Sequence, residues 1–303
     1  MRLCYNTENQ TQSDPMSHTI RIAHSPDADD IFMYYAIAFG WVDTDDMRFE
    51  NEALDIETLN QEAMKGTYDV TAVSFAAYPY LKEEYALLRT AVSFGEGYGP
   101  KLIKRRGETL KRRFKVALSG RYTTNAMLVR IYYPDARPVY RNFLDIEQAV
   151  LNGEVDAGVL IHESILDFDE RLEVEKEVWD IWQDLGGEGL PLPLGGMALR
   201  RSIPLHRAIA IEKILIEGVK VANARKEELC AKLQADRLVR ISDAMLARYL
   251  DMYASDSSAE LNDTQIDALD KLYEIGFAHG LWECPIKTKD YLIPQEYSQL
   301  RSR

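Results

Sequence analysis

The sequence has few cysteines and no long apolar run. Its three cysteines, Cys4, Cys230 and Cys284, are far apart and show no Cys-x-x-Cys spacing, so neither a disulfide framework nor a zinc site is expected. Every apolar run is far shorter than the ~20 residues that cross a bilayer, and the N-terminal stretch has no signal-peptide core. We therefore expect a protein of the reducing cytoplasm that has no membrane partner.

Basic residues are also scarce relative to acidic ones, with 36 Lys and Arg against 49 Asp and Glu and a formal net charge of −13. Nonspecific nucleic-acid binding needs clustered basic side chains, so nucleic acid is not an expected partner. The chain is 46% hydrophobic and 28% charged, which is an ordinary globular composition.

Its 303 residues suffice for two domains. Residues 1–15 are polar and patternless, and Met16 is an alternative start, so we expect this stretch to lie outside the fold.

From Thr19 onward, short apolar segments alternate with amphipathic ones, a pattern typical of an α/β fold with a largely parallel sheet. Strands are expected at 19–24, 47–54, 68–73, 114–118 and 155–161, with strand-like segments at 85–94, 101–104 and 197–199. Helices are expected at 31–37, 55–66, 75–81, 123–132, 143–151, 205–234, 242–254 and 263–279. The glycine-rich segment 95–100 lacks the third glycine and the following helix of a dinucleotide-binding loop, so a crossover is favoured.

Small polar side chains follow three of the predicted strands, at 25–30, at Ser74 and at 119–125. In parallel sheets, ligands bind beyond the carboxyl ends of the strands, where helix N-termini present free N–H groups. Such groups predict a site for a carboxylate, with ordinary helix capping as the alternative. The residues concerned are Ser74, Thr123, Thr124 and Asn125.

His162 directly follows the apolar strand expected at 155–161 and should therefore lie at the ligand edge of a sheet. An imidazole with an ordinary pKa of about 6.5 suits a general base near neutral pH, and a half-buried structural histidine is the alternative. His24, at the end of the first strand, is a second candidate. No histidine pair has metal-ligand spacing, so we expect no metal, and no nucleophile elbow is present. Two kinds of function are therefore left: proton-transfer chemistry in a two-domain cleft, or ligand binding there without chemistry.

Four segments together carry a family resemblance. They are SPDADD at 25–30, SGRYTT at 119–124, GEVDAGVLIHES at 153–164 and GLPLPLG at 189–195. Segments 57–60 and 73–78 are similar as well. Over residues 20–201 the chain resembles the 1,4-dihydroxy-6-naphthoate synthases, which act in the futalosine route to menaquinone.

The resemblance implies a two-domain, type-2 periplasmic-binding-protein-like fold with a ligand cleft between the domains. We expect a larger α/β domain made of residues 17–109 and 199–303, which includes the C-terminal helices, and a smaller α/β domain of residues 110–198. The chain should cross between them near 105–113 and 197–203, where closure of the cleft needs a hinge.

The resemblance also implies an activity. The histidine matching His162 is the proposed base, which takes a proton from cyclic dehypoxanthine futalosine. A carbon–carbon bond then breaks to give 1,4-dihydroxy-6-naphthoate and a three-carbon fragment, and no cofactor is implied. The substrate-binding residues expected from the family are Asp30, Asn60, Ser74, Thr124 and Asn125. In the opening motif Ser25, Pro26 and Asp30 fit the family pattern, whereas Asp27, Ala28 and Asp29 depart from it.

Two other functions remain open at this point. A cytoplasmic solute-binding or sensor protein would use the same cleft for a small carboxylate, and chorismate dehydratases share the fold. If His162 is the base, kcat/KM should fall on the acid side within the range from pH 5 to 8, where an unperturbed histidine titrates.

Overall fold

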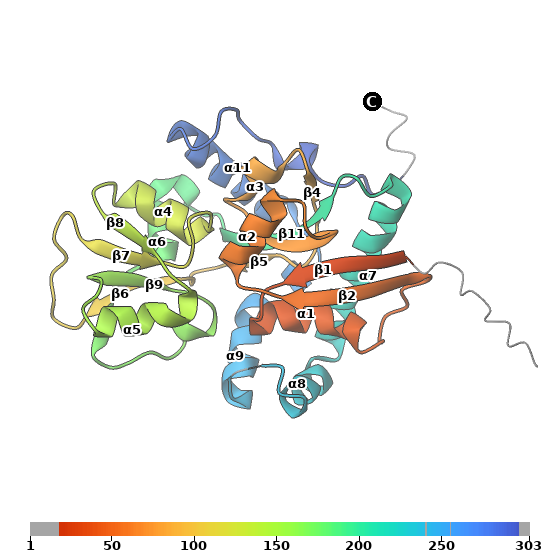
Figure 1. Ribbon diagram of the computed structural model, residues 1–303, viewed down its shortest axis with the longest axis horizontal. Coiled ribbons are helices and arrows are strands. Elements are labelled where there is room, and N and C mark those ends of the chain that lie inside the picture. The colour runs from red at the N-terminus through yellow and green to blue at the C-terminus, as the bar shows by residue number, and fades with distance from the viewer. Residues whose placement is uncertain (1–17, 240, 255, 297–303) are drawn as a thin grey trace, which may run out of the picture.

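The computed structural model describes residues 18–239, 241–254 and 256–296. Two β-sheets lie beside each other, and helices flank both of them (Figure 1). Within the described ranges, no helix has the length and apolar character that a membrane span requires. The stretch 1–15, which we expected to lie outside the fold, falls outside these ranges.

The first sheet has the strand order β2-β1-β3-β11-β4, and β5 pairs with β11. Its strands are β1 (His18–His24), β2 (Met47–Ala53), β3 (Val70–Ser74), β4 (Tyr85–Leu87), β5 (Ser93–Gly95) and β11 (Leu192–Arg200). Strands β1, β2 and β3 are parallel, whereas β11 runs antiparallel to β3 and β4. Every residue of β3 is buried, so its carboxyl end at Ser74 is held firmly at the edge of the sheet.

The second sheet has the order β10-β6-β9-β7-β8. Its strands are β6 (Lys101–Arg105), β7 (Lys115–Leu118), β8 (Arg137–Tyr140), β9 (Ala157–Leu160) and β10 (Leu172–Glu177). Strand β9 is wholly buried and parallel to β7, as expected for the apolar run at 155–161. The parallel arrangement brings the segments that follow β7 and β9 to one edge.

Most helices follow the predicted amphipathic segments, but the helix expected at 205–234 is divided at Arg225, and two short helices, 178–182 and 256–259, were not predicted. The helices are α1 (Ala28–Ala38), α2 (Ile56–Met64), α3 (Tyr78–Leu81), α4 (Thr124–Tyr132), α5 (Ile146–Leu151), α6 (Val178–Trp182), α7 (Leu205–Ala224), α8 (Lys226–Ala235), α9 (Asp243–Tyr253), α10 (Asp256–Ala259) and α11 (Asp263–Ala278), with short turns η1 (Phe143–Asp145), η2 (His162–Ile165), η3 (Gln183–Gly187) and η4 (Thr288–Asp290). Asp55 and Thr123 cap α2 and α4, as their residue types suggest. Helices α7, α8 and α9 pack on α1 (Figure 1).

The chain passes between the sheets earlier than the sequence suggested. Strand β6 pairs with β9 and β10 in the second sheet, and β11 pairs with β3 in the first. The first connection therefore runs through 96–100, whereas the sequence predicted it at 105–113. The second runs through 178–191, whereas the prediction was 197–203. An apolar pattern marks a strand without showing which sheet it joins, and this is why β6 was assigned to the larger domain. The glycine-rich segment is a crossover, as expected.

Two strands of the second sheet were not predicted. Strand β8 is mostly exposed, and β10 has the sequence LEVEKE. Both lie at the edges of the sheet, where charged side chains are tolerated and hide the apolar alternation. Similarly, Pro193 and Gly195 made the first half of β11 resemble a loop.

Candidate active site

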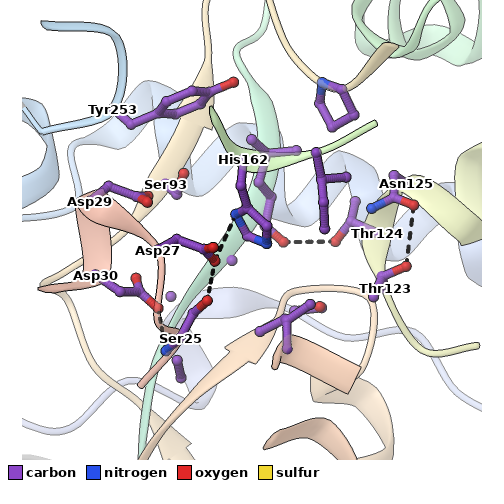
Figure 2. Close-up of a pocket in the computed structure, with 18 of the residues that line it drawn as sticks. Ser25, Asp27, Asp29, Asp30, Ser93, Thr123, Thr124, Asn125, His162 and Tyr253 are labelled. Carbon is purple, nitrogen blue, oxygen red and sulfur yellow. Dashed lines mark hydrogen bonds and ion pairs between the residues drawn. The ribbon is translucent and has the colours of Figure 1, made fainter. Parts of the chain in front are cut away.

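A pocket lies between the two sheets, where strand ends of both meet (Figure 2). Its cavity volume is about 90 Å³, within about 680 Å³ of space that is partly open to solvent. Its polar lining consists of Ser25, Asp27, Asp29, Asp30, Ser74, Ser93, Thr123, Thr124, Asn125, His162, Tyr249 and Tyr253. The structure thus brings together every predicted site residue except Asn60.

The imidazole of His162 is paired with a carboxylate from the opposite side of the pocket. Its Nδ1 lies 2.8 Å from Oδ2 of Asp27, and the side chains are 18% and 1% exposed. The same carboxylate accepts a hydrogen bond from the Ser25 hydroxyl (Figure 2). The other ring nitrogen, Nε2, is buried and has no hydrogen-bond partner among the described residues. The ring is therefore held through Nδ1, and Nε2 is left for a ligand.

The backbone at His162 supports a functional role. His162 begins η2 with a φ of +54°, in the left-handed region that a residue other than glycine adopts only at some cost. Phe143 contacts its ring edge-on at a centroid distance of 4.9 Å. A strained backbone, one ring contact and one ion pair together fix the direction of the imidazole.

Carboxyl groups surround the imidazole and set its protonation. Burial opposes the charged form of His162, but Asp27, Asp29 and Glu163 outweigh this effect and raise its pKa to about 9. Burial, with the charge of Asp27, raises the pKa of Asp29 to about 6. Burial and the charge of Asp29 raise the pKa of Asp30 well above its usual range. At neutral pH His162 is therefore mainly an imidazolium.

The acidic segment 27–30 is held by the start of α1. Asp27 is the N-cap residue of this helix, and a negative charge is favourable near a helix N-terminus. The amide of Ala28 donates to Oε1 of Glu163 at 3.0 Å, and the amide of Ser25 donates to Oδ2 of Asp30 at 2.8 Å. Since Glu163 belongs to η2, the Ala28–Glu163 bond joins the two sides of the pocket beside His162 and Asp27.

Asn60 supports Ser74 from behind. Its amide nitrogen donates to Ser74 Oγ at 3.1 Å, and its Oδ1 accepts from the Ser74 amide at 2.9 Å. Asn60 is fully buried and does not line the pocket. The Ser74 oxygen accepts from Asn60, so its own O–H can donate into the pocket.

The hydroxyl of Thr124 joins three segments of the pocket wall. It donates to the carbonyl of Leu194 at 2.9 Å and accepts from the amide of Ala76 at 3.2 Å. With this hydroxyl so engaged, the N–H groups in the first turn of α4 are the donors that this segment can offer a ligand. Thr123 caps the helix by accepting from the Ala126 amide at 3.4 Å, and it donates to Asn125 Oδ1 at 3.3 Å.

His24 has a structural role. Its Nδ1 lies 2.7 Å from the carbonyl of Ser25, and its Nε2 lies 3.2 Å from the amide nitrogen of Asn51. Burial lowers the pKa of His24, which keeps the ring neutral. It does not line the pocket between the sheets, whereas His162 does.

Sequence reasoning missed three residues that line the pocket, Asp27, Tyr249 and Tyr253. Asp27 departs from the family motif and was not assigned a role. Tyr249 and Tyr253 come from α9, and Tyr249 donates to Oδ1 of Asp29 at 3.3 Å. Tyrosines on an amphipathic helix look like core residues, so the sequence offers no signal for them. In the described ranges, no group of three or more His, Cys, Asp or Glu side chains is arranged to hold a metal ion.

Comparison with known proteins gives a consistent result. Residues 20–278 match the model of a family described as menaquinone biosynthesis. A curated 1,4-dihydroxy-6-naphthoate synthase from Thermus thermophilus is 30% identical over 262 residues, which cover 86% of this chain and 95% of that protein.

Solved structures also resemble this chain. A crystal structure of an Archaeoglobus fulgidus protein is 37% identical, with a TM-score of 0.80, and the match covers 88% of this chain and 100% of that one. An alkanesulfonate-binding protein from Xanthomonas axonopodis has a TM-score of 0.66 at 12% identity. The match covers 92% of this chain and 99% of that protein. The last match confirms the periplasmic-binding-protein-like fold.

Proposed function

The chain belongs to the menaquinone-biosynthesis family, and from this premise we propose that it is a 1,4-dihydroxy-6-naphthoate synthase, a carbon–carbon lyase that uses His162 as its general base. One observation carries this proposal. The imidazole is oriented by Asp27 through Nδ1, at 2.8 Å, while Nε2 has no hydrogen-bond partner among the described residues. This is the arrangement that proton abstraction from a bound small molecule requires.

In the proposed reaction, Nε2 of His162 takes a proton from cyclic dehypoxanthine futalosine. A carbon–carbon bond then breaks, which releases 1,4-dihydroxy-6-naphthoate and a three-carbon fragment. Asp27 stabilises the imidazolium that forms and keeps the ring in one orientation. A positioned base contributes typically about 10²–10⁴-fold to the rate. Because the pKa of His162 is raised to about 9, the active neutral form is a minor species at pH 7.

The substrate carboxylate is assigned to the donors around Ser74 and the N-terminus of α4. Ser74 offers its hydroxyl, and the first turn of α4 offers N–H groups at its positive end. Asp30 and Asn60 support this region and the acidic segment rather than contacting the carboxylate. The site needs no cofactor in this scheme.

Closure of the cleft would exclude water from the proton transfer. Contacts that join the two sides support this idea: Asp27 with His162, Ala28 with Glu163, and the Tyr122 amide with Glu57 at 3.1 Å. The connections 96–100 and 178–191 are the natural hinges. Structures with and without ligand should differ by a relative rotation of the two sheets.

The direct test is to incubate the protein separately with cyclic dehypoxanthine futalosine and with chorismate, and to follow products by mass spectrometry. We expect 1,4-dihydroxy-6-naphthoate from the first and no reaction with the second. Reversible binding without product, or turnover of chorismate alone, would overturn the proposal. We assign the enzyme to the cytoplasm.

A further inference from the structure

We propose that a second groove, which adjoins the Ala76–Thr124 contact, binds an aromatic carboxylate. The groove has a cavity volume of about 320 Å³, which is within the range of small-molecule sites. The residues that carry the argument are Tyr80, Arg121, Tyr122, Arg130, Leu281 and Trp282. This inference concerns binding and stands apart from the proposed lyase activity.

Two guanidinium groups give the groove a positive character. Arg121 and Arg130 form no ion pair with any residue in the described part of the chain, whereas Arg105 and Arg112 on the same half of the molecule pair with Glu108 and Asp135. The chain as a whole carries a net charge of −13. Two unneutralised arginines in one groove of such a chain form a site for an anion, and guanidinium suits a carboxylate by its paired N–H geometry.

Aromatic rings line the same groove. The ring of Tyr80 meets Tyr122 edge-on at 5.7 Å and Trp282 edge-on at 6.3 Å. The Tyr80 hydroxyl donates to the carbonyl of Leu281 at 2.7 Å, which fixes this ring although its side chain is 51% exposed. Fixed, exposed rings offer flat apolar surfaces on which another ring can stack. Rings beside arginines select an aromatic anion over a bare phosphate or a sugar.

The groove also connects with the cleft. Tyr80 belongs to α3, beside the first sheet. Arg121 precedes α4 and Arg130 lies on it, beside the second sheet. Ala76 lines the groove, and its amide donates to the Thr124 hydroxyl in the active-site wall. A ligand in the groove would contact both sides of the cleft and favour the arrangement seen here, so its binding is coupled to closure.

The test uses 2-naphthoate as the probe and the indole N–H signal of Trp282 as the readout. In ¹⁵N-labelled protein this signal is assigned with Trp282→Phe. We expect 2-naphthoate to shift it saturably. The neutral analogue 2-naphthylmethanol and inorganic phosphate should shift it at least tenfold more weakly at equal concentration.

Arginine variants identify the site. Arg121→Gln combined with Arg130→Gln should weaken the naphthoate-dependent shift at least tenfold. The charge-matched control, Arg48→Gln with Arg112→Gln, changes two exposed arginines and should leave it unchanged. Each single variant should weaken the naphthoate-dependent shift partially. The single variants therefore still test the proposal if the double variant fails to fold. An absent shift in the wild type, an equal response to the alcohol or to phosphate, or unchanged binding in the folded arginine variants would overturn the proposal.

Discussion

The active-site pocket and the second groove differ in the kind of charge that they contain. The cleft pocket holds groups that can gain or lose a proton, namely His162 with a pKa of about 9 and Asp29 with a pKa of about 6. The second groove holds Arg121 and Arg130, and a guanidinium group is a cation that does not act as an acid or base in proteins. Proton transfer needs groups of the first kind, whereas holding an anion needs only the second. The difference assigns chemistry to the cleft and recognition to the groove.

The largest expected effect is the loss of activity in His162→Ala. Removing the base should lower kcat/KM by about 10²–10⁴-fold, measured as formation of 1,4-dihydroxy-6-naphthoate. The matched control is His206→Ala, since His206 is exposed at the start of α7 and should be silent. Turnover near the wild-type rate in the His162 variant would place the chemistry elsewhere.

Asp27→Asn should lower kcat by about 10²-fold, because the amide no longer stabilises the imidazolium or fixes the ring orientation. Asp46→Asn, which changes an exposed carboxylate, serves as the control. A substrate KM that rises while kcat stays constant would show that Asp27 binds substrate instead of acting through His162.

Stability should fall as the pH rises from about 6.5 to 9. The folded pKa of His162 lies near 9, and the unfolded value near 6.5. Its ion pair with Asp27 therefore stabilises the fold fully below pH 6.5, and this contribution is lost as the pH passes 9. Since the side chain is only 18% exposed, we expect a loss of about 3 kcal/mol, measured by urea unfolding. His162→Ala should show a much flatter pH dependence; an equally steep one would contradict the assignment.

The smallest of these effects is expected from Gly120→Ala, which tests closure. A Cβ at Gly120 would lie 2.2 Å from Oε2 and 2.6 Å from Cβ of Glu57, so the two sides could not approach as they do here. We expect kcat/KM to fall about tenfold, since misplacement by about 1 Å can cost up to 10²-fold. Adding Glu57→Gly removes the Cβ of Glu57 together with its carboxylate, so the clash is gone and much of the loss should be restored. If the double variant is as slow as the single one, the contact does not limit closure.

Much of this site could be predicted from local sequence. Apolar strands followed by small polar residues located Ser74, the start of α4 and His162, because parallel strands bring their carboxyl ends to one edge. Asn60 lies behind Ser74 and does not line the pocket, since a motif shows that a residue matters without showing whether it touches the ligand.

Other features depend on contacts between distant segments. The pairing of Asp27 with His162 joins two segments far apart in the chain and from opposite sides of the cleft, so neither segment alone reveals it. The sheet to which β6 belongs is decided by its partners β9 and β10. Tyr249 reaches Asp29 from a C-terminal helix whose sequence shows only an amphipathic pattern.

The pH profile of kcat/KM for the wild type and Asp27→Asn tests the central claim most directly, because this ratio reports ionisations of the free enzyme. The wild-type value should rise through neutral pH and level off near pH 9, the raised pKa of His162. In Asp27→Asn the rising limb should move to lower pH, since the neighbouring negative charge is gone. A wild-type profile that is flat from pH 5 to 8, or a limb that Asp27→Asn leaves in place, would contradict the account.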